Sequence, residues 1–328
     1  MINKYGLDDF MREIEADKFG KKDFRINNDC LKMDDDGSLV GESDDQSFVL
    51  KLNEWGRNQV LWRTGATGFN KYGSYLHEIG REKELADLFN MHMERLVERR
   101  GIKKWLVRAK GGTARAVLTD RYSMLDNDFL ADNIYKYFKD IDVSVVGNNI
   151  SDVYMNIRIK INDMTISANN DSDPLSVALH VVNSEVGASS IVVYPVVYRQ
   201  VCSNGMVVEY GTGQKFRQRH LVSADEGQEK INAKVADAIK AGDVAISEFL
   251  KTKDVKISNP KEVIERLAKD QKYNDKLLES IQESFKVEND YTKYGVINAF
   301  TRSARDFDYE KRIEIERFAG SLLMKKIA

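Results

Sequence analysis

The side chains best suited to chemistry in this 328-residue sequence are cations that gather in two short stretches. Residues 103–121 carry six lysines and arginines against one acid, Asp120. Guanidinium groups bind phosphates through paired hydrogen bonds, and an adjacent aromatic ring can stack a base. We therefore expect this stretch to contact a nucleic acid through Arg108, Lys110, Arg115, Arg121 and Tyr122.

The second stretch, residues 211–220, reads GTGQKFRQRH and interleaves an aromatic ring with cations. Its glycines would let the backbone approach a ligand closely. We expect it to complete the nucleic-acid surface through Lys215, Phe216, Arg217 and Arg219. Both stretches also have a plainer interpretation, because basic segments are often only solvated surface. The first could equally form structural ion pairs with Asp120, Asp126 and Asp128.

Those three aspartates suggest a second chemistry. Carboxylates beside a basic hairpin could hold Mg²⁺ for phosphate hydrolysis, which would make the protein a metal-dependent nuclease. However, Asp126 and Asp128 stand where a helix cap is expected, and no His or Lys lies at motif spacing beside them. None of the four histidines falls at the spacing of metal ligands. We therefore expect a binding protein without a metal, a cofactor or a catalytic residue.

A third possibility is recognition of another protein. Residues 31–45, LKMDDDGSLVGESDD, are acidic and could form an arm that captures a host protein, for example to inhibit host defence. Cys202 could act as a nucleophile, but its place in an apolar strand favours a buried, inert thiol. The Gly-rich segment 61–68 lacks the Gly-Lys-Ser/Thr of a P-loop, so we interpret it as a core loop.

Composition bears on the cellular compartment of the protein. The net charge is −2, and two cysteines make no disulfide framework, so we expect both thiols to be reduced. No window approaches the roughly 20 uninterrupted apolar residues of a membrane span. The first 20 residues contain spaced acids and no apolar signal region. We expect a cytoplasmic protein without a membrane segment.

Hydrophobic periodicity predicts the elements that position the basic side chains. Gly111 and Gly112 form a turn between strands at 105–109 and 114–118. Helices are predicted at 7–16, 84–100 and 129–138, and strict apolar–polar alternation predicts a half-buried strand at 153–161. The β-branched run 177–210 predicts three strands, and Pro195 within it indicates a sheet edge or a bulge.

From residue 223 onward the pattern is helical, and Asn259 is expected to cap a helix that begins at Pro260. We therefore predict an α+β fold with a mainly antiparallel sheet of hairpins and packed helices, followed by a helical C-terminal part. The expected divisions are an N-terminal helix with an acidic arm (1–45), an α+β core (46–222) and a helical region (223–328).

Three segments carry a resemblance to a known family. They are NSEVG at 183–187, RQVCSNGM at 199–206 and RAVLTDRY at 115–122, and the similarity continues to NAFT at 298–301. In these segments the sequence resembles the phage/plasmid-like protein family, domain of unknown function 932. The resemblance implies carriage on phages, plasmids and integrated elements, and it supplies no established catalytic residues. The order of strands, hairpins and helices is also similar to that of phage single-strand annealing proteins such as RecT, Red-beta and Erf. This second similarity concerns the order of elements and not the sequence.

Together these observations predict a nucleic-acid-binding protein of a mobile element. We expect it to form a homo-oligomer that holds single-stranded DNA along a basic sheet face and anneals it during phage or plasmid recombination. The metal-dependent nuclease and the protein-interaction factor remain the alternatives.

Overall fold

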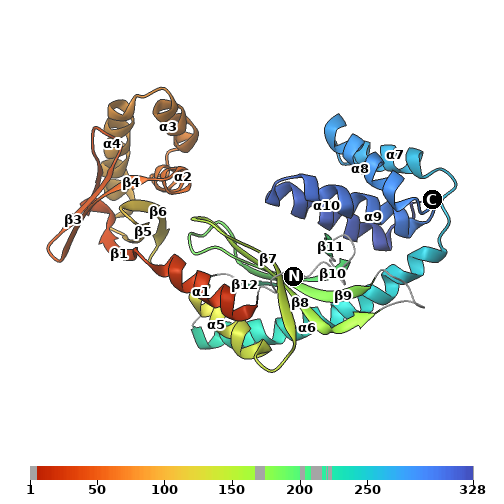
Figure 1. Cartoon of the computed structure of the whole chain (residues 1–328). Helices are drawn as coiled ribbons and strands as arrows, with labels where there is room; N and C mark the ends of the chain where they lie inside the picture. The colour runs from red at the N-terminus through yellow and green to blue at the C-terminus, as the bar shows by residue number, and fades with distance from the viewer. Residues whose placement is uncertain are drawn as a thin grey trace.

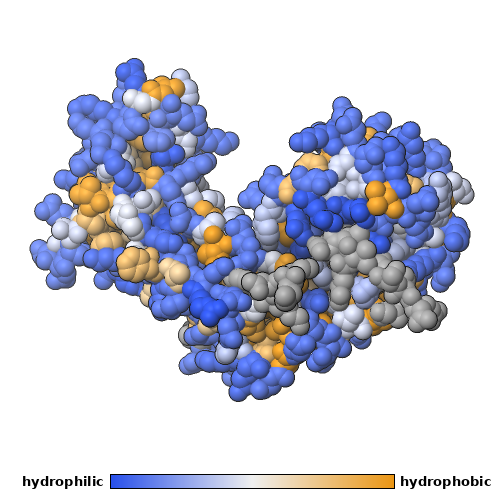
Figure 2. Space-filling model, in the orientation of Figure 1, coloured by the Kyte–Doolittle hydropathy of each residue, from blue (hydrophilic) through white to orange (hydrophobic). Residues whose placement is uncertain are grey.

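The computed structural model describes residues 6–166, 174–199, 204–207, 216–218, 220 and 224–327. The chain is an α+β protein, as predicted, and has three parts (Figure 1). An N-terminal lobe and a lobe of C-terminal helices stand at the two ends of a second sheet. Figure 2 shows a hollow between the two lobes.

The N-terminal lobe is a mixed sheet in the order β1-β5-β6-β4-β3-β2, packed against three helices. Only the β4–β6 pairing is parallel. Its core contains Phe24, Phe48, Leu61 and Phe89. The strands are β1 (Lys21–Asn27), β2 (Leu31–Met33), β3 (Leu39–Ser43), β4 (Gln46–Leu52), β5 (Lys104–Lys110) and β6 (Thr113–Thr119), and the helices are α2 (Glu54–Arg63), α3 (Phe69–Glu78) and α4 (Glu82–Arg100).

The predicted hairpin at 105–118 is confirmed, because β5 and β6 pair antiparallel through the Gly111–Gly112 turn. The predicted acidic arm is wrong. Residues 31–33 and 39–43 form paired strands, because Leu31, Met33 and Leu39 are buried in the lobe's core. The aspartates at 34–36 occupy only the tight turn between these strands. Because this stretch is so acidic, the sequence pattern did not predict the short strands on either side of the turn.

The second sheet is antiparallel, in the order β11-β10-β9-β8-β7, with β12 also paired to β10. Helices α1, α5 and α6 cover one of its faces (Figure 1), where Ile157, Leu179 and Val181 meet Phe10 and Leu130. The strands are β7 (Val143–Ile150), β8 (Met155–Ile166), β9 (Leu175–Asn183), β10 (Ile191–Arg199), β11 (Asn204–Val207) and β12 (Phe216–Gln218), and the helices are α1 (Leu7–Lys18), α5 (Asn127–Phe138) and α6 (Ala224–Lys251).

The strand predictions at 153–161 and 177–182 are confirmed by β8 and β9. The strand predicted at 191–201 is seen as β10 over residues 191–199, and 200–201 lie outside the described residues. The third predicted strand, 206–210, is seen as β11 over its first residues, and 208–210 lie outside the described residues. Pro195 is tolerated for a local reason. Along its edge of β10, β12 pairs with residues 191–193 and β11 with residues 196–199, so Pro195 falls between the two partner strands.

The C-terminal lobe consists of α7 (Pro260–Asp270), α8 (Asp275–Glu288), α9 (Lys293–Ser303) and α10 (Tyr309–Ser321). Helix α9 lies at the centre of this lobe, and all of its residues except Arg302 are buried. The predicted cap is confirmed, because the Asn259 side chain accepts a hydrogen bond from the Glu262 amide. None of the helices in the described part of the chain is long and apolar enough to cross a membrane.

Candidate nucleic-acid interface

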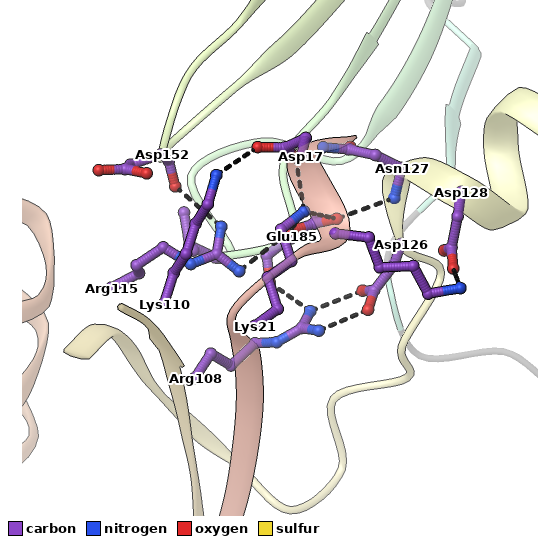
Figure 3. Close-up of polar contacts among 12 residues, drawn as sticks. Asp17, Lys21, Arg108, Lys110, Arg115, Asp126, Asn127, Asp128, Asp152 and Glu185 are labelled. Atoms are coloured by element: carbon purple, nitrogen blue, oxygen red, sulfur yellow. Dashed lines mark hydrogen bonds and ion pairs between the residues drawn. The ribbon is translucent and has the colours of Figure 1, made fainter. Parts of the chain in front are cut away.

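The arginines of the β5–β6 hairpin do not lie on an open surface. Arg108 is 2% exposed and Arg115 is 3% exposed. Both Arg108 Nη atoms bind Asp126, at 2.6 and 2.5 Å (Figure 3). Arg108 Nε binds Asp23 at 3.0 Å. Burial by itself would lower the pKa of Arg108, but the hydrogen bonds and charges of the two aspartates raise it above its ordinary value.

Arg115 is matched by Glu185, which lies in the turn between β9 and β10. Arg115 Nη2 is 3.1 Å from Glu185 Oε2, Lys21 Nζ is 2.8 Å from the same oxygen, and the Asn127 amide donates to Oε1 at 3.1 Å. Burial opposes ionisation of Glu185, yet the two cations and the amide together hold its pKa below the ordinary value. Lys110 completes the cluster by pairing with Asp17 at 2.6 Å.

These contacts form a polar joint between the N-terminal lobe and the second sheet (Figure 3). The same 183–187 turn is also held from α2, because Trp55 Nε1 and Gln59 Nε2 both donate to the Val186 carbonyl. Gly187 adopts a φ of +75°, and a Cβ there would approach a Leu118 methyl to 2.9 Å. Two of the segments that carry the family resemblance therefore meet in this joint.

The remaining predicted contact residues are placed differently. Arg121 is exposed on the turn after β6. The Tyr122 ring stacks on His220 with a centroid separation of 4.8 Å, and its hydroxyl donates to the Ser184 carbonyl. Phe216 and Arg217 lie in β12, whose backbone pairs with β10. Lys215 and Arg219 lie outside the described residues.

The plainer interpretation of the first basic stretch thus holds for Arg108, which pairs with Asp126. Asp128 instead pairs with Lys18 of α1. With Asp126 and Asp128 occupied in this way, the aspartates proposed for the nuclease alternative are not assembled into a metal site. Across the described residues, no group of three or more His, Cys, Asp or Glu side chains could hold a metal ion.

A second cationic region lies in the N-terminal lobe, around residues 61–68. The interpretation of this segment as a core loop is wrong, because 61–63 belong to α2 and Gly65, Thr67 and Gly68 are exposed. A pocket of about 740 Å³ opens between the α2–α3 loop, the end of α4 and the start of β5. The described residues that line it include no carboxylate. Its cations are Arg63, Lys71, Arg100 and Lys103.

Glycines shape the α2–α3 loop. Gly65 and Gly68 both adopt positive φ angles near +75°, which turn the chain sharply between the two helices. A Cβ on Gly65 would lie 4.0 Å from the Arg100 guanidinium group, so the loop closely faces the end of α4. The Arg63 Nε donates to the Val117 carbonyl, and burial lowers the Arg63 pKa to about 10, so this cation remains charged at neutral pH.

Aromatic rings accompany the cations. Trp62 lines the pocket and is 67% exposed, whereas Trp105 is 5% exposed and closes the pocket from within. A neighbouring pocket of about 380 Å³ shares Arg100 and the loop, and adds Arg95 and Arg99 from the last turns of α4. The sequence contained these signals separately, but nothing in it indicated that residues 62–71 and 95–105 would face each other.

The fold and these sites define an α+β protein with a polar joint between two sheets and a basic, tryptophan-lined pocket in its first lobe. The chain belongs to the family described as a domain of unknown function (DUF932), whose model matches residues 116–312. The match covers the second sheet and most of the C-terminal helices, and the basic pocket lies before it. Comparisons with curated proteins and with solved structures gave no match.

Proposed function

We propose that this protein binds single-stranded nucleic acid and that the basic pocket of the N-terminal lobe is its principal contact. One observation carries the proposal. Four cations surround a pocket of about 740 Å³, and the described residues that line it include no carboxylate. An exposed tryptophan lies at its side. A concave surface of one charge focuses the electrostatic potential and attracts an anionic polymer. The buried ion pairs of Arg108 and Arg115 carry no part of this argument.

The exposed ring favours a single strand. The bases of an unpaired strand are free to stack on an aromatic side chain, and each stacked base contributes about 1–3 kcal/mol. Tyr72 and Tyr75 of α3 are also half-exposed, beyond the first turn of α3 that lines the pocket. Such stacking accepts any base, which suits binding without sequence preference.

The wider role we propose is annealing of DNA strands in the cytoplasm by a homo-oligomer encoded on a phage or plasmid. The support for this role is the resemblance to the phage/plasmid-like family and to the element order of single-strand annealing proteins. Strand pairing requires that bound bases stay accessible, and a site that holds phosphates with cations leaves base edges free.

The test is fluorescence anisotropy with labelled single- and double-stranded oligonucleotides of equal length over a salt series. Arg100 and Lys103 are exposed, so the double variant Arg100→Ala/Lys103→Ala should fold normally. Each lost phosphate contact flattens the dependence of log K on log salt by about 0.7 for a single strand, so the double variant should flatten it by about 1.4.

The matched control is Lys261→Ala/Lys269→Ala, which removes the same charge from the exposed face of α7. This control should keep the wild-type slope. Trp62→Ala should weaken single-strand binding about 5- to 150-fold, the equivalent of one lost stack, while the salt slope stays unchanged. Absence of binding at low salt, or equal slopes for the pocket variant and the control, would refute the proposal.

A further inference from the structure

A second large pocket lies between a face of the second sheet and helix α10. Its volume is about 670 Å³. It combines the β7–β8 end of the sheet, strand β9, the turn that leads into β10 and the first half of α10. Its polar lining is mainly uncharged, with amides, hydroxyls and an imidazole from Asn149, Ser151, Tyr154, Asn156, His180, Ser189 and Tyr309.

The innermost polar group of this pocket has unused hydrogen-bonding capacity. His180 is 1% exposed, and its Nε2 lies 2.5 Å from the Tyr309 hydroxyl. Its Nδ1 has no hydrogen-bond partner among the described residues, and the same is true of Arg317 Nε. Buried polar atoms are nearly always paired, so these two nitrogens are exceptions in the interior beside the pocket. Both are themselves buried, so the groups open to a ligand are the asparagine, serine and tyrosine side chains of the lining.

A buried ion pair fixes helix α10 to the sheet beside His180. Arg158 and Glu316 are both buried and form a paired ion bridge at 3.2 and 2.5 Å that fixes α10 against the sheet. Arg312 Nε binds the same carboxylate at 3.0 Å. Burial, followed by the charges of the nearby arginines, lowers the pKa of His180 well below its ordinary value, so the imidazole is neutral. The pocket therefore presents a neutral ring on a rigid support.

The charge at this pocket differs from the charge at the basic pocket. Its lining has one cation, Arg317, whose guanidinium group lies 4.6 Å from the centre of the Tyr194 ring. Two carboxylates, Asp308 and Glu310, also line it. This balance repels a phosphate group. The amides of Asn149 and Asn156 each offer both a donor and an acceptor, which matches the mixed edge of an uncharged heterocycle.

We propose that this pocket binds a nucleobase, extruded from the strand whose phosphates the basic pocket holds. The inference rests on the proposed function, because it supplies the source of the base. The two pockets differ in the groups they offer. The described lining of the basic pocket has cations and no acids and binds the phosphates, whereas this pocket has neutral donors and acceptors beside tyrosine rings and binds the base. A base seated here is unstacked from its neighbours, so this pocket favours a single strand over a duplex.

The experiment is titration of the full-length protein with adenosine, guanosine, cytidine and uridine, followed by calorimetry or ligand-detected NMR. Nucleosides carry a base without a phosphate, and ribose 5-phosphate serves as the probe with a phosphate and no base. We expect at least one nucleoside to bind. Asn156→Leu, which keeps the side-chain shape, and Asn149→Ala, at an exposed position, should each weaken binding about tenfold.

The basic-pocket variant Arg100→Ala/Lys103→Ala should bind nucleosides like the wild type. If no nucleoside binds at millimolar concentration, or if neither asparagine variant weakens binding, the base pocket is refuted. Oligonucleotide anisotropy on the same samples separates the two proposals. Retained strand binding without nucleoside binding overturns only the base pocket, whereas nucleoside binding without strand binding overturns the proposed function.

Discussion

Replacement of Glu185 by glutamine should destabilise the joint between the N-terminal lobe and the second sheet. Glu185 is 4% exposed and accepts hydrogen bonds from Lys21, Arg115 and the Asn127 amide. Glutamine keeps the shape but removes the charge and offers an N–H group where the carboxylate had an oxygen. Arg115, which is 3% exposed, would then remain buried without its anion.

The expected size follows from this burial. Removing one partner of a buried ion pair costs about 3–5 kcal/mol, chiefly because the remaining charge has lost its hydration without compensation. A chain of 328 residues has an unfolding entropy of roughly 0.7 kcal/mol/K. The melting temperature should therefore fall by about 4–7 °C if the chain unfolds as one unit.

Differential scanning calorimetry of Glu185→Gln, with Glu279→Gln as the control, measures this change. Glu279 is an exposed carboxylate on α8, so its replacement should alter stability by less than about 0.5 kcal/mol. If the two variants melt within a degree of each other, the buried joint does not contribute in the way that its geometry implies. A separate early transition in Glu185→Gln would show that the N-terminal lobe detaches first.

Three further predictions follow from single groups. The folded-state pKa of Glu185 lies below its ordinary 4.5, so the carboxylate stabilises the fold fully above that pH and loses its effect as pH falls through the folded value. The stability difference between wild type and Glu185→Gln should therefore shrink below about pH 4, as measured by thermal melts in acid. Gly56→Ala should lower the free energy of unfolding by about 1–3 kcal/mol in denaturant titrations, since a Cβ there would lie 2.5 Å from the Ala114 carbonyl oxygen; an unchanged midpoint would contradict the close packing of α2 on β6. Asn274→Ala should cost about 1 kcal/mol by removing the cap that accepts from the Leu277 amide, and Asn274→Asp should retain most of that stability in the same titration.

The sequence predicted those features that depend on neighbouring residues. Alternation at 153–161 predicted a strand, because side chains on a strand point alternately to its two sides, and β8 confirms it. The prediction that only one face is buried is wrong, since Asn156 and Arg158 on the polar face are buried as well, with Arg158 paired to Glu316 of α10. The cap at Asn259 and the Gly111–Gly112 turn were equally local. The acidic arm failed for a local reason too: two short strands flank three aspartates, and a charge run outweighs so few apolar residues in any sequence pattern.

Tertiary structure alone decided which cations are available. Arg108 and Arg100 are the same residue type in basic surroundings, yet one is held by Asp126 and Asp23 while the other lines an open pocket. The difference depends on carboxylates and loops from distant parts of the chain, and sequence proximity does not record which charges meet after folding. The sequence determined an α+β pattern with clustered cations. The packing of the lobes determined which of these cations lie buried in ion pairs and which line the basic pocket.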